Sequence, residues 1–191
     1  MDWETSGSGW RNRTGTLKPS WAGPIPVFEP STLEQIFEFR ESIWRNEPSV
    51  IDAHKLDPAS LRDAHDTHGL HWIITVKKSI VAAARLGIHG DASDLSYFDG
   101  YHHLKADIAA PFASLNRLVV HPSMRRCGLS RALTSVRIDA ARSNGAKTIL
   151  VEAAPNRIPG LREFGFVELG YSVALPWELV PFTIMYLNIS E

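Results

Sequence analysis

The stretch Arg-Arg-Cys-Gly-Leu-Ser-Arg between Arg125 and Arg131 places guanidinium groups, a glycine and a hydroxyl around the start of a helical pattern. The first main-chain N–H groups of a helix have no acceptor inside the helix, and its aligned peptide dipoles make that end electropositive. Gly128 would let a ligand approach the main chain closely. The stretch therefore predicts a cradle for an anion the size of a pyrophosphate, or else a basic surface turn without a ligand. The residues assigned to this cradle are Arg125, Arg126, Cys127, Gly128, Leu129, Ser130 and Arg131.

Two other groups of side chains in the chain could do chemistry. Cys127 would sit at a helix N-terminus beside arginines, which favours a thiolate, but no His/Asp set is recognisable around it and a packing role is the better interpretation. His102 and His103 follow several aspartates, yet their spacing matches no metal-ligand pattern. We therefore predict no metal site.

Length, composition and charge indicate one ordinary globular domain. The chain has 191 residues, 44% of them hydrophobic, and a formal net charge of −1. This charge balance does not indicate nucleic acid as the main partner. The single cysteine excludes an internal disulfide framework and fits a reducing compartment, and no apolar run is long enough to span a membrane. We expect a cytoplasmic protein, monomeric or homodimeric, without a membrane partner.

Turn residues and periodicity divide the chain into a flexible N-terminal tail, residues 1–25, and a single domain, residues 26–191. Ser31 followed by Glu34 predicts a capping box that opens the first helix of that domain. The first half of the domain is predicted to contain a short strand at 27–30, helices at 31–47 and 57–69, and strands at 70–76 and 79–88. A long segment follows at 88–113. The second half is predicted to contain a strand at 114–120, a helix at 129–144, a strand at 147–155, a helical turn at 159–166, and strands at 166–175 and 181–189. This order predicts a mixed α/β fold of the α+β kind, in which the long segment forms a lid or pocket wall.

The strand, corner and helix around Gly128 resemble the acyl-CoA binding motif of the GNAT superfamily of N-acyltransferases. Arg125, Gly128 and Ser130 occupy the three positions of the pattern Arg/Gln-x-x-Gly-x-Gly/Ala, with Ser130 as a small departure. The later stretches "ILVEAAPN" and "LREFGF" are similar to the family's next strand and its Gly-Phe corner. The resemblance covers residues 27–189. It implies a central, mostly antiparallel sheet with two splayed parallel strands, flanked by helices.

The resemblance also implies a co-substrate and a reaction. Acetyl-CoA, or another acyl-CoA, would lay its pantetheine arm beside main-chain groups of Leu118, Val119 and Val120 and its pyrophosphate on the corner amides. Asn156 would contact the same arm through its side chain. The implied activity is transfer of an acetyl group to a primary amine of a small molecule by direct attack on the thioester.

The catalytic side chains implied by the resemblance are only partly matched. Many family members carry a glutamate on the motif strand as general base, whereas this region holds Ser114, Asn116 and Arg117. Glu152 on the next strand is the nearest carboxylate, although it could equally be a paired or surface residue. The position of the family's proton-donating tyrosine holds Leu161, so that either Tyr171 or solvent would supply the thiolate's proton.

The acceptor pocket is assigned to the first helices and the long segment, with Arg40, Tyr97, Phe98 and Tyr101 as candidate contacts. Arg40 could instead be paired within the structure.

Two alternative functions stay open. The chain is also similar to acyl-homoserine-lactone synthases and long-chain N-acyl amino acid synthases, which take acyl chains from acyl carrier protein and whose strand-end arginines Arg85 and Arg117 match. Because the usual tyrosine and glutamate are missing, the chain could also be a non-catalytic acyl-CoA-binding module.

Overall fold

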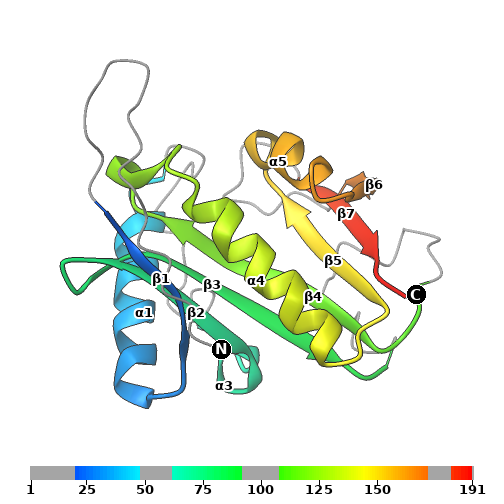
Figure 1. Cartoon of the computed structure of the whole chain (residues 1–191), viewed down its shortest axis with the longest axis horizontal. Helices are drawn as coiled ribbons and strands as arrows, with labels where there is room; N and C mark the ends of the chain where they lie inside the picture. The colour runs from blue at the N-terminus through cyan, green and yellow to red at the C-terminus, as the bar shows by residue number, and fades with distance from the viewer. Residues whose placement is uncertain (1–19, 48–61, 92–107, 172–181, 191) are drawn as a thin grey trace.

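The computed structural model describes residues 20–47, 62–91, 108–171 and 182–190 (Figure 1). These ranges contain one sheet, whose strands in spatial order are β1 (Ala22–Val27), β2 (Leu70–Val76), β3 (Ser79–His89), β4 (Phe112–Val120), β5 (Thr148–Ala153), β7 (Thr183–Asn188) and β6 (Val167–Tyr171). All neighbours pair antiparallel except β4 and β5, which run parallel. The predicted mixed α/β architecture is confirmed.

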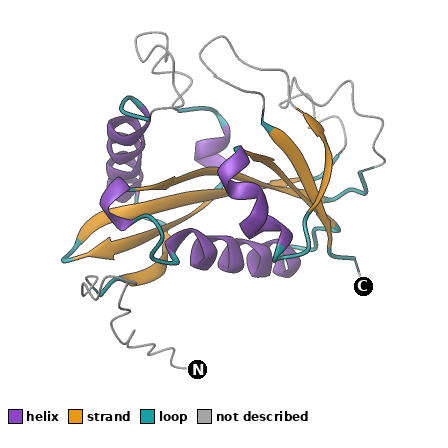
Figure 2. Cartoon of the chain, turned by 90° about the horizontal axis from the view of Figure 1, so that it is seen from above, coloured by secondary structure: helices purple, strands orange, loops and turns teal. Residues whose placement is uncertain are grey.

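Helices cover both faces of this sheet (Figure 2). They are α1 (Pro30–Trp44), α3 (His65–His68), α4 (Leu129–Ser143) and α5 (Ile158–Arg162), with single 3₁₀ turns η4 (Pro122–Met124) and η5 (Pro155–Arg157). One apolar cluster joins α4 and α5 to the sheet, and a smaller one joins α1 to β2, β3 and β4. None of the helices in the described ranges is both long and apolar enough to cross a bilayer.

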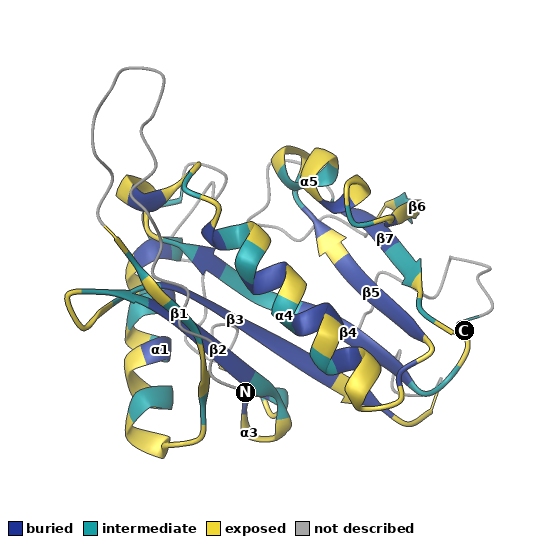
Figure 3. Ribbon diagram, in the orientation of Figure 1, coloured by how far each residue is buried: buried dark blue, intermediate teal, exposed yellow. Residues whose placement is uncertain are grey.

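Helix α4 matches its prediction closely, because its pattern is strong and local. The residues that face the sheet are buried along one side, while the opposite side is exposed (Figure 3). The buried side chains are those of Leu129, Leu133, Thr134, Arg137, Ile138 and Ala141. An arginine in this row was not anticipated, and its contacts are described below.

The first strand and the first helix both begin earlier than predicted. Strand β1 starts at Ala22 and pairs with β2, so residues 22–25 belong to the sheet rather than to the predicted tail. Helix α1 starts at Pro30, because a proline at the first helical position loses no intrahelical hydrogen bond. Ser31 therefore lies inside the helix, and the predicted capping box is wrong: the N-cap is Glu29, without a side-chain bond.

The remaining predicted strands are confirmed where the structure describes them. Strands β2 and β3 form a hairpin whose turn residues, Lys77 and Lys78, both have positive φ, as the twist of a two-residue hairpin requires. Of the predicted 57–69 helix, residues 62–69 are described, and only α3 (His65–His68) is helical, so the prediction is wrong for residues 62–64. The candidate acceptor contacts Tyr97, Phe98 and Tyr101 lie outside the described residues.

Candidate functional site

The sheet opens between its two parallel strands. Strands β4 and β5 pair only from Phe112 to Ser114 and from Thr148 to Leu150, although β4 continues to Val120 and β5 to Ala153. Beyond the paired segment the two strands diverge on either side of α4 in the view of Figure 1. The described part of β4 therefore has a free edge over its second half, as the resemblance implied.

The register of β4 decides which main-chain groups face this free edge. The His121 N–H donates to the Val81 carbonyl (2.8 Å), so His121 faces β3. With the two-residue period of a strand, Val119 faces β3 as well, opposite Ala83. The main-chain groups of Leu118 and Val120 then point toward the open side. Of the three residues assigned to the pantetheine arm, Val119 is therefore wrongly placed as a main-chain contact.

A bulge in β4 produces this arrangement. The register shifts between Ala83 and Arg85 of β3, and Arg117 of β4 has a φ of 54°. A bulge inserts one unpaired residue and changes which face the following side chains occupy. After it, Leu118 packs with the cluster on the α4 side, whereas Val119 packs with the cluster on the α1 side.

The corner after β4 presents main-chain N–H groups that make no hydrogen bond within the described part of the chain. The first helical bond of α4 runs from the Ala132 N–H to the Gly128 carbonyl (3.0 Å), and Gly128 itself has a φ of 83° and no side-chain cap. Among the described residues, no acceptor lies within hydrogen-bond distance of the amides at positions 127–131. This row of amides is the feature that an anion cradle requires.

Two arginines of the corner, Arg125 and Arg131, form surface pairs with other described residues. Arg125 donates to Glu47 (2.5 Å) and more weakly to the Val120 carbonyl (3.4 Å). Arg131 pairs with Glu163 and lies over the Phe164 ring (5.2 Å). Exposed pairs of this kind contribute about 0–1 kcal/mol, so both guanidinium groups could exchange a carboxylate for a bound anion at low cost.

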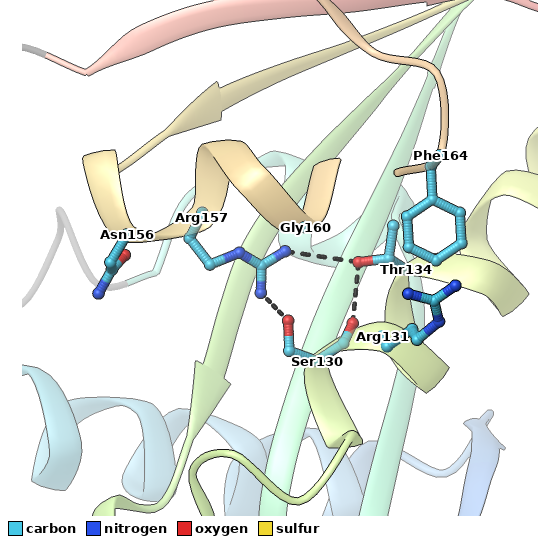
Figure 4. Close-up of a pocket in the computed structure, with 7 residues that line it drawn as sticks. All are labelled: Ser130, Arg131, Thr134, Asn156, Arg157, Gly160 and Phe164. Atoms are coloured by element: carbon cyan, nitrogen blue, oxygen red, sulfur yellow. Dashed lines mark hydrogen bonds between the residues drawn. The ribbon is translucent and has the colours of Figure 1, made fainter. Parts of the chain in front are cut away.

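Arg157 is a site residue that sequence reasoning missed. It lines a pocket of about 120 Å³ between α4 and α5, together with Ser130, Arg131, Thr134, Asn156, Gly160 and Phe164. Its guanidinium donates to the Ser130 hydroxyl and to the Thr134 hydroxyl (3.4 Å), as Figure 4 shows. Burial lowers the pKa of Arg157 to about 10. It therefore remains charged at neutral pH, beside the second helical residue of α4.

Asn156 lines this same pocket from η5, so the structure brings it near the α4 N-terminus. The helix that follows, α5, has five residues. Its length agrees with the helical turn, rather than a longer helix, that the sequence predicts at 159–166.

Asn116 of β4 and Glu152 of β5 flank the open part of the sheet on the face opposite α4. Ser114 pairs with Leu150, so these residues share a face, and Asn116 and Glu152 two positions later share it too. Asn116 donates through Nδ2 to the Ser114 hydroxyl (2.7 Å), which lies 2.8 Å from His89 Nε2. Glu152 is exposed. The predicted base is thus at the opening of the sheet.

Tyr171 is not brought to this opening. It lies at the end of β6, pairs with Thr183 and is 62% exposed. Because β7 lies between β5 and β6, Tyr171 is about two strand spacings, roughly 10 Å, farther out than β5. The prediction that Tyr171 donates the proton is therefore wrong for this arrangement.

A buried group of arginines and aspartates lies on the α1 side of the bulge. Arg40 donates to both carboxylate oxygens of Asp66 (3.1 Å each), and Arg85 contacts Asp66 at 2.9 Å. Arg85 and Arg117 each approach Asp63 to 2.6 Å. Arg40 is 0% exposed, so its assignment as an acceptor contact is wrong and its alternative, pairing within the structure, is correct.

His71 lies against this group. Its Nε2 donates to the Asp66 carbonyl (3.0 Å), and its buried Nδ1 has no partner in the described part of the chain. Burial lowers the pKa of His71, and the nearby charges of Arg40 and Arg85 act in the same direction. A second proton on this ring would be buried without an acceptor among the described residues.

No group of three or more His, Cys, Asp or Glu side chains is arranged to hold a metal ion within residues 20–47, 62–91, 108–171 and 182–190.

Comparison with known families identifies the fold. Residues 33–166 match the acetyltransferase (GNAT) family, which is more than half of the chain. The chain belongs to the GNAT family. The open pair of parallel strands and the amides at the α4 N-terminus are thus parts of a GNAT acetyltransferase domain. No curated protein matches this chain.

Solved structures agree on the GNAT fold. A structure of histone acetyltransferase HPA2 and related acetyltransferase from Corynebacterium glutamicum superposes with a TM-score of 0.64 at 19% identity, covering 89% of this chain and 98% of that one. FeeM, an N-acyl amino acid synthase from uncultured soil microbes, gives 0.62 at 11% identity, with coverages of 90% and 92%. The ribosomal-protein-S18-alanine N-acetyltransferase from Escherichia coli gives 0.56 at 19%, with coverages of 87% and 96%.

Proposed function

We propose that this GNAT protein transfers an acetyl group from acetyl-CoA to the primary amine of a small molecule. The observation that carries the proposal is that the anion-binding corner adjoins the free edge of β4. The amides at positions 127–131, which have no hydrogen-bond acceptor among the described residues, follow the free edge of β4, where Leu118 and Val120 present their main-chain groups. An anion bound at the corner could therefore continue as an extended arm along the strand.

The amides and cations of the corner suit the diphosphate of CoA. Main-chain N–H groups at a helix N-terminus bind anions without titrating. Arg125, Arg126 and Arg131 surround them, and Arg157 adds a charge that is largely removed from water. Charge-assisted hydrogen bonds of this kind contribute about 1.5–3 kcal/mol each.

In the proposed reaction the neutral amine attacks the thioester carbonyl carbon directly. The new C–N bond forms, the C–S bond breaks, the amine loses one proton and the departing thiolate takes up one. We assign the Leu118 N–H, the first main-chain donor after the bulge, to the carbonyl oxygen. Such a donor contributes about two to three powers of ten in rate.

Glu152 is the proposed base for the amine. It shares the face opposite α4 with Asn116, at the opening of the sheet, and its carboxylate reaches solvent. A carboxylate can accept the amine's proton directly or through one water molecule. Tyr171 lies two strands away from β5, so we propose that solvent supplies the thiolate's proton. The small-molecule acceptor and the cytoplasmic location stay predictions from the sequence.

The test is release of free CoA thiol from acetyl-CoA in the presence of a library of amines. Transfer should appear as amine-dependent thiol release, and Glu152→Gln should lower its rate without changing the affinity for acetyl-CoA. Binding of acetyl-CoA without thiol release for any amine or any acyl donor would contradict the enzyme and favour a non-catalytic binding module.

A charge reversal tests the corner separately. Arg126→Glu should weaken acetyl-CoA binding about tenfold or more in calorimetry, because it places a carboxylate among the phosphate-binding amides. Arg142→Glu, at the exposed C-terminal end of α4 and far from the corner, is the matched control. Equal affinities for the two variants would contradict the position of the diphosphate.

One observation favours a second candidate, transfer of a longer acyl chain from acyl carrier protein or acyl-CoA. Arg85 and Arg117, which match strand-end arginines of the acyl-homoserine-lactone and N-acyl amino acid synthases, meet on the single carboxylate of Asp63. Rates with acyl donors of two to twelve carbons, on CoA and on acyl carrier protein, decide between the candidates. The acetyl proposal requires the highest kcat/KM for the two-carbon CoA donor.

A further inference from the structure

Arg137 of α4 is a buried cation that the proposed chemistry does not use. It is 1% exposed, and in the described part of the chain no carboxylate lies within ion-pair distance of it. Burial lowers the pKa of Arg137 to about 9, and the nearby charge of Arg157 contributes in the same direction. The side chain still carries its proton at neutral pH. A charge kept under these conditions needs hydrogen-bond acceptors around it.

The acceptors of Arg137 are main-chain carbonyls. Its Nε donates to the Leu133 carbonyl one turn earlier in α4 (2.9 Å). Its Nη1 donates to the carbonyls of Arg85 (3.1 Å) and Asn116 (3.3 Å). Arg85 and Asn116 are paired across β3 and β4 immediately before the register shifts. One guanidinium nitrogen thus holds both strands at the bulge.

The bulge needs such support, because its backbone is strained. Arg117 follows the Asn116 carbonyl and has a φ of 54°, a region that costs a residue with a side chain about 1–3 kcal/mol. Without the bulge, the side chains that follow would exchange faces and the Leu118 amide would turn toward β3. The free edge of β4 would then present different groups.

We propose that Arg137 is a positioning residue for acyl transfer: by binding the Asn116 carbonyl, it fixes the bulge and so aims the Leu118 N–H at the open side of the sheet. This inference rests on the proposed function. Arg137 does not touch the thioester; its effect passes through the main chain of residues 116–118. Loss of Arg137 should therefore lower kcat while leaving the binding corner at positions 125–131 intact.

The experiment compares Arg137→Gln and Arg137→Lys with Ile138→Ala. Ile138 is buried in the same helix and packs against the sheet, but its side chain has no hydrogen bond to the bulge. Both Arg137 variants should lose about 10²-fold in kcat, as expected for a displaced transition-state donor, with acetyl-CoA affinity changed less than threefold. The Ile138 variant controls for lost stability. Its kcat, measured well below its melting temperature, should stay within about threefold of the wild-type value, because the Leu118 N–H is not displaced in this variant.

Three results would overturn the inference. The first is an unchanged kcat in the Arg137 variants. The second is an equal loss of kcat in the Ile138 variant. The third is a parallel loss of acetyl-CoA affinity, which would indicate general damage to the fold.

An independent measurement separates this inference from the proposed function. In nitrogen-15 NMR of the wild-type protein, the coupling constant of Arg117 should report a positive φ, and the Arg137 Nη protons should exchange slowly. The Leu118 amide resonance should shift in the Arg137 variants but not in the Ile138 variant. A negative φ at Arg117, or fast exchange of the Arg137 protons, contradicts the inference even if no Arg137 variant folds. If the wild type transfers no acyl group while these signals are as expected, the proposed function alone fails.

Discussion

On the α1 side of the β4 bulge the buried arginines are compensated by carboxylates, whereas on the α4 side Arg137 is compensated by carbonyl dipoles. Asp63 and Asp66 take up most of the charge of three arginines on the first side. On the second side, Arg137 and Arg157 have only neutral partners in the described residues. The three arginines and two aspartates on the first side thus sum to a formal charge of +1, whereas Arg137 and Arg157 on the second side keep +2.

The difference separates a structural use of arginine from an electrostatic one. A buried ion pair holds elements together but gives little net field, while a cation held by dipoles keeps its potential. The uncompensated cations lie on the face that carries the proposed diphosphate site. Four predictions test this comparison, from the largest expected effect to the smallest.

The largest effect is expected for Asp66→Asn. The substitution leaves Arg40 and Arg85 with less compensation in a buried site, and removing one partner of such a group costs about 3–5 kcal/mol. Urea unfolding would give the change in the free energy of unfolding. A loss below about 1 kcal/mol would mean that the carboxylates are not needed to compensate these arginines.

A smaller effect is expected on the opposite face for Arg157→Met. Methionine keeps much of the shape of the arginine side chain but removes one positive charge from the pocket beside α4. Acetyl-CoA should therefore bind about tenfold more weakly, while the free energy of unfolding should change little. Calorimetric titration measures the affinity. Arg162→Met removes an exposed arginine from the neighbouring α5 and serves as the control. An equal change in both variants would remove the distinction between the faces.

The pH dependence of stability tests the α1 side alone. Because burial lowers the pKa of His71 below its usual 6.5, the unfolded chain binds more protons there near and below that pH. Stability should therefore fall as pH decreases from about 7 through 6.5, by at most about 1.4 kcal/mol per pH unit from this residue. In thermal unfolding, His71→Gln should reduce the dependence of stability on pH between about pH 5 and 6.5. An unchanged dependence would mean that other groups cause it.

The smallest effect is expected on the surface. Asp139 pairs with Arg142 at 3.5 Å on the exposed side of α4. Asp139→Asn should change the free energy of unfolding by less than about 0.5 kcal/mol, and the same urea measurements provide the value. A loss comparable to that of Asp66→Asn would show that burial does not set the cost of losing a carboxylate in this protein.

What the sequence predicts well is local. Helix α4 and the corner before it follow from a continuous apolar periodicity, a glycine and neighbouring arginines. Each of these features acts within a few residues, so a single sequence reveals them. The parallel pair and its opening came from the family resemblance instead.

What the sequence does not predict depends on distant partners. The Asp63–Arg117 contact joins residues 54 positions apart, and the Arg137–Arg85 contact joins residues 52 apart. The bulge had no sequence signal, because its positive φ falls on an arginine rather than a glycine. Val119 was therefore assigned to the wrong edge. The assignment of Tyr171 failed because β7 lies between β5 and β6 although it comes last in the chain.

The short parallel ladder of β4 and β5 has a mechanical consequence. Within the described residues, only three registered pairs, all between β4 and β5, connect the four strands on one side of the sheet to the three on the other. Most of the remaining connection comes from the apolar contacts beneath α4 and α5. The sheet thus consists of two strand groups, β1–β4 and β5–β7, with a short connection between them. Any extended molecule that hydrogen-bonds to both groups would add to this connection and make the domain more rigid.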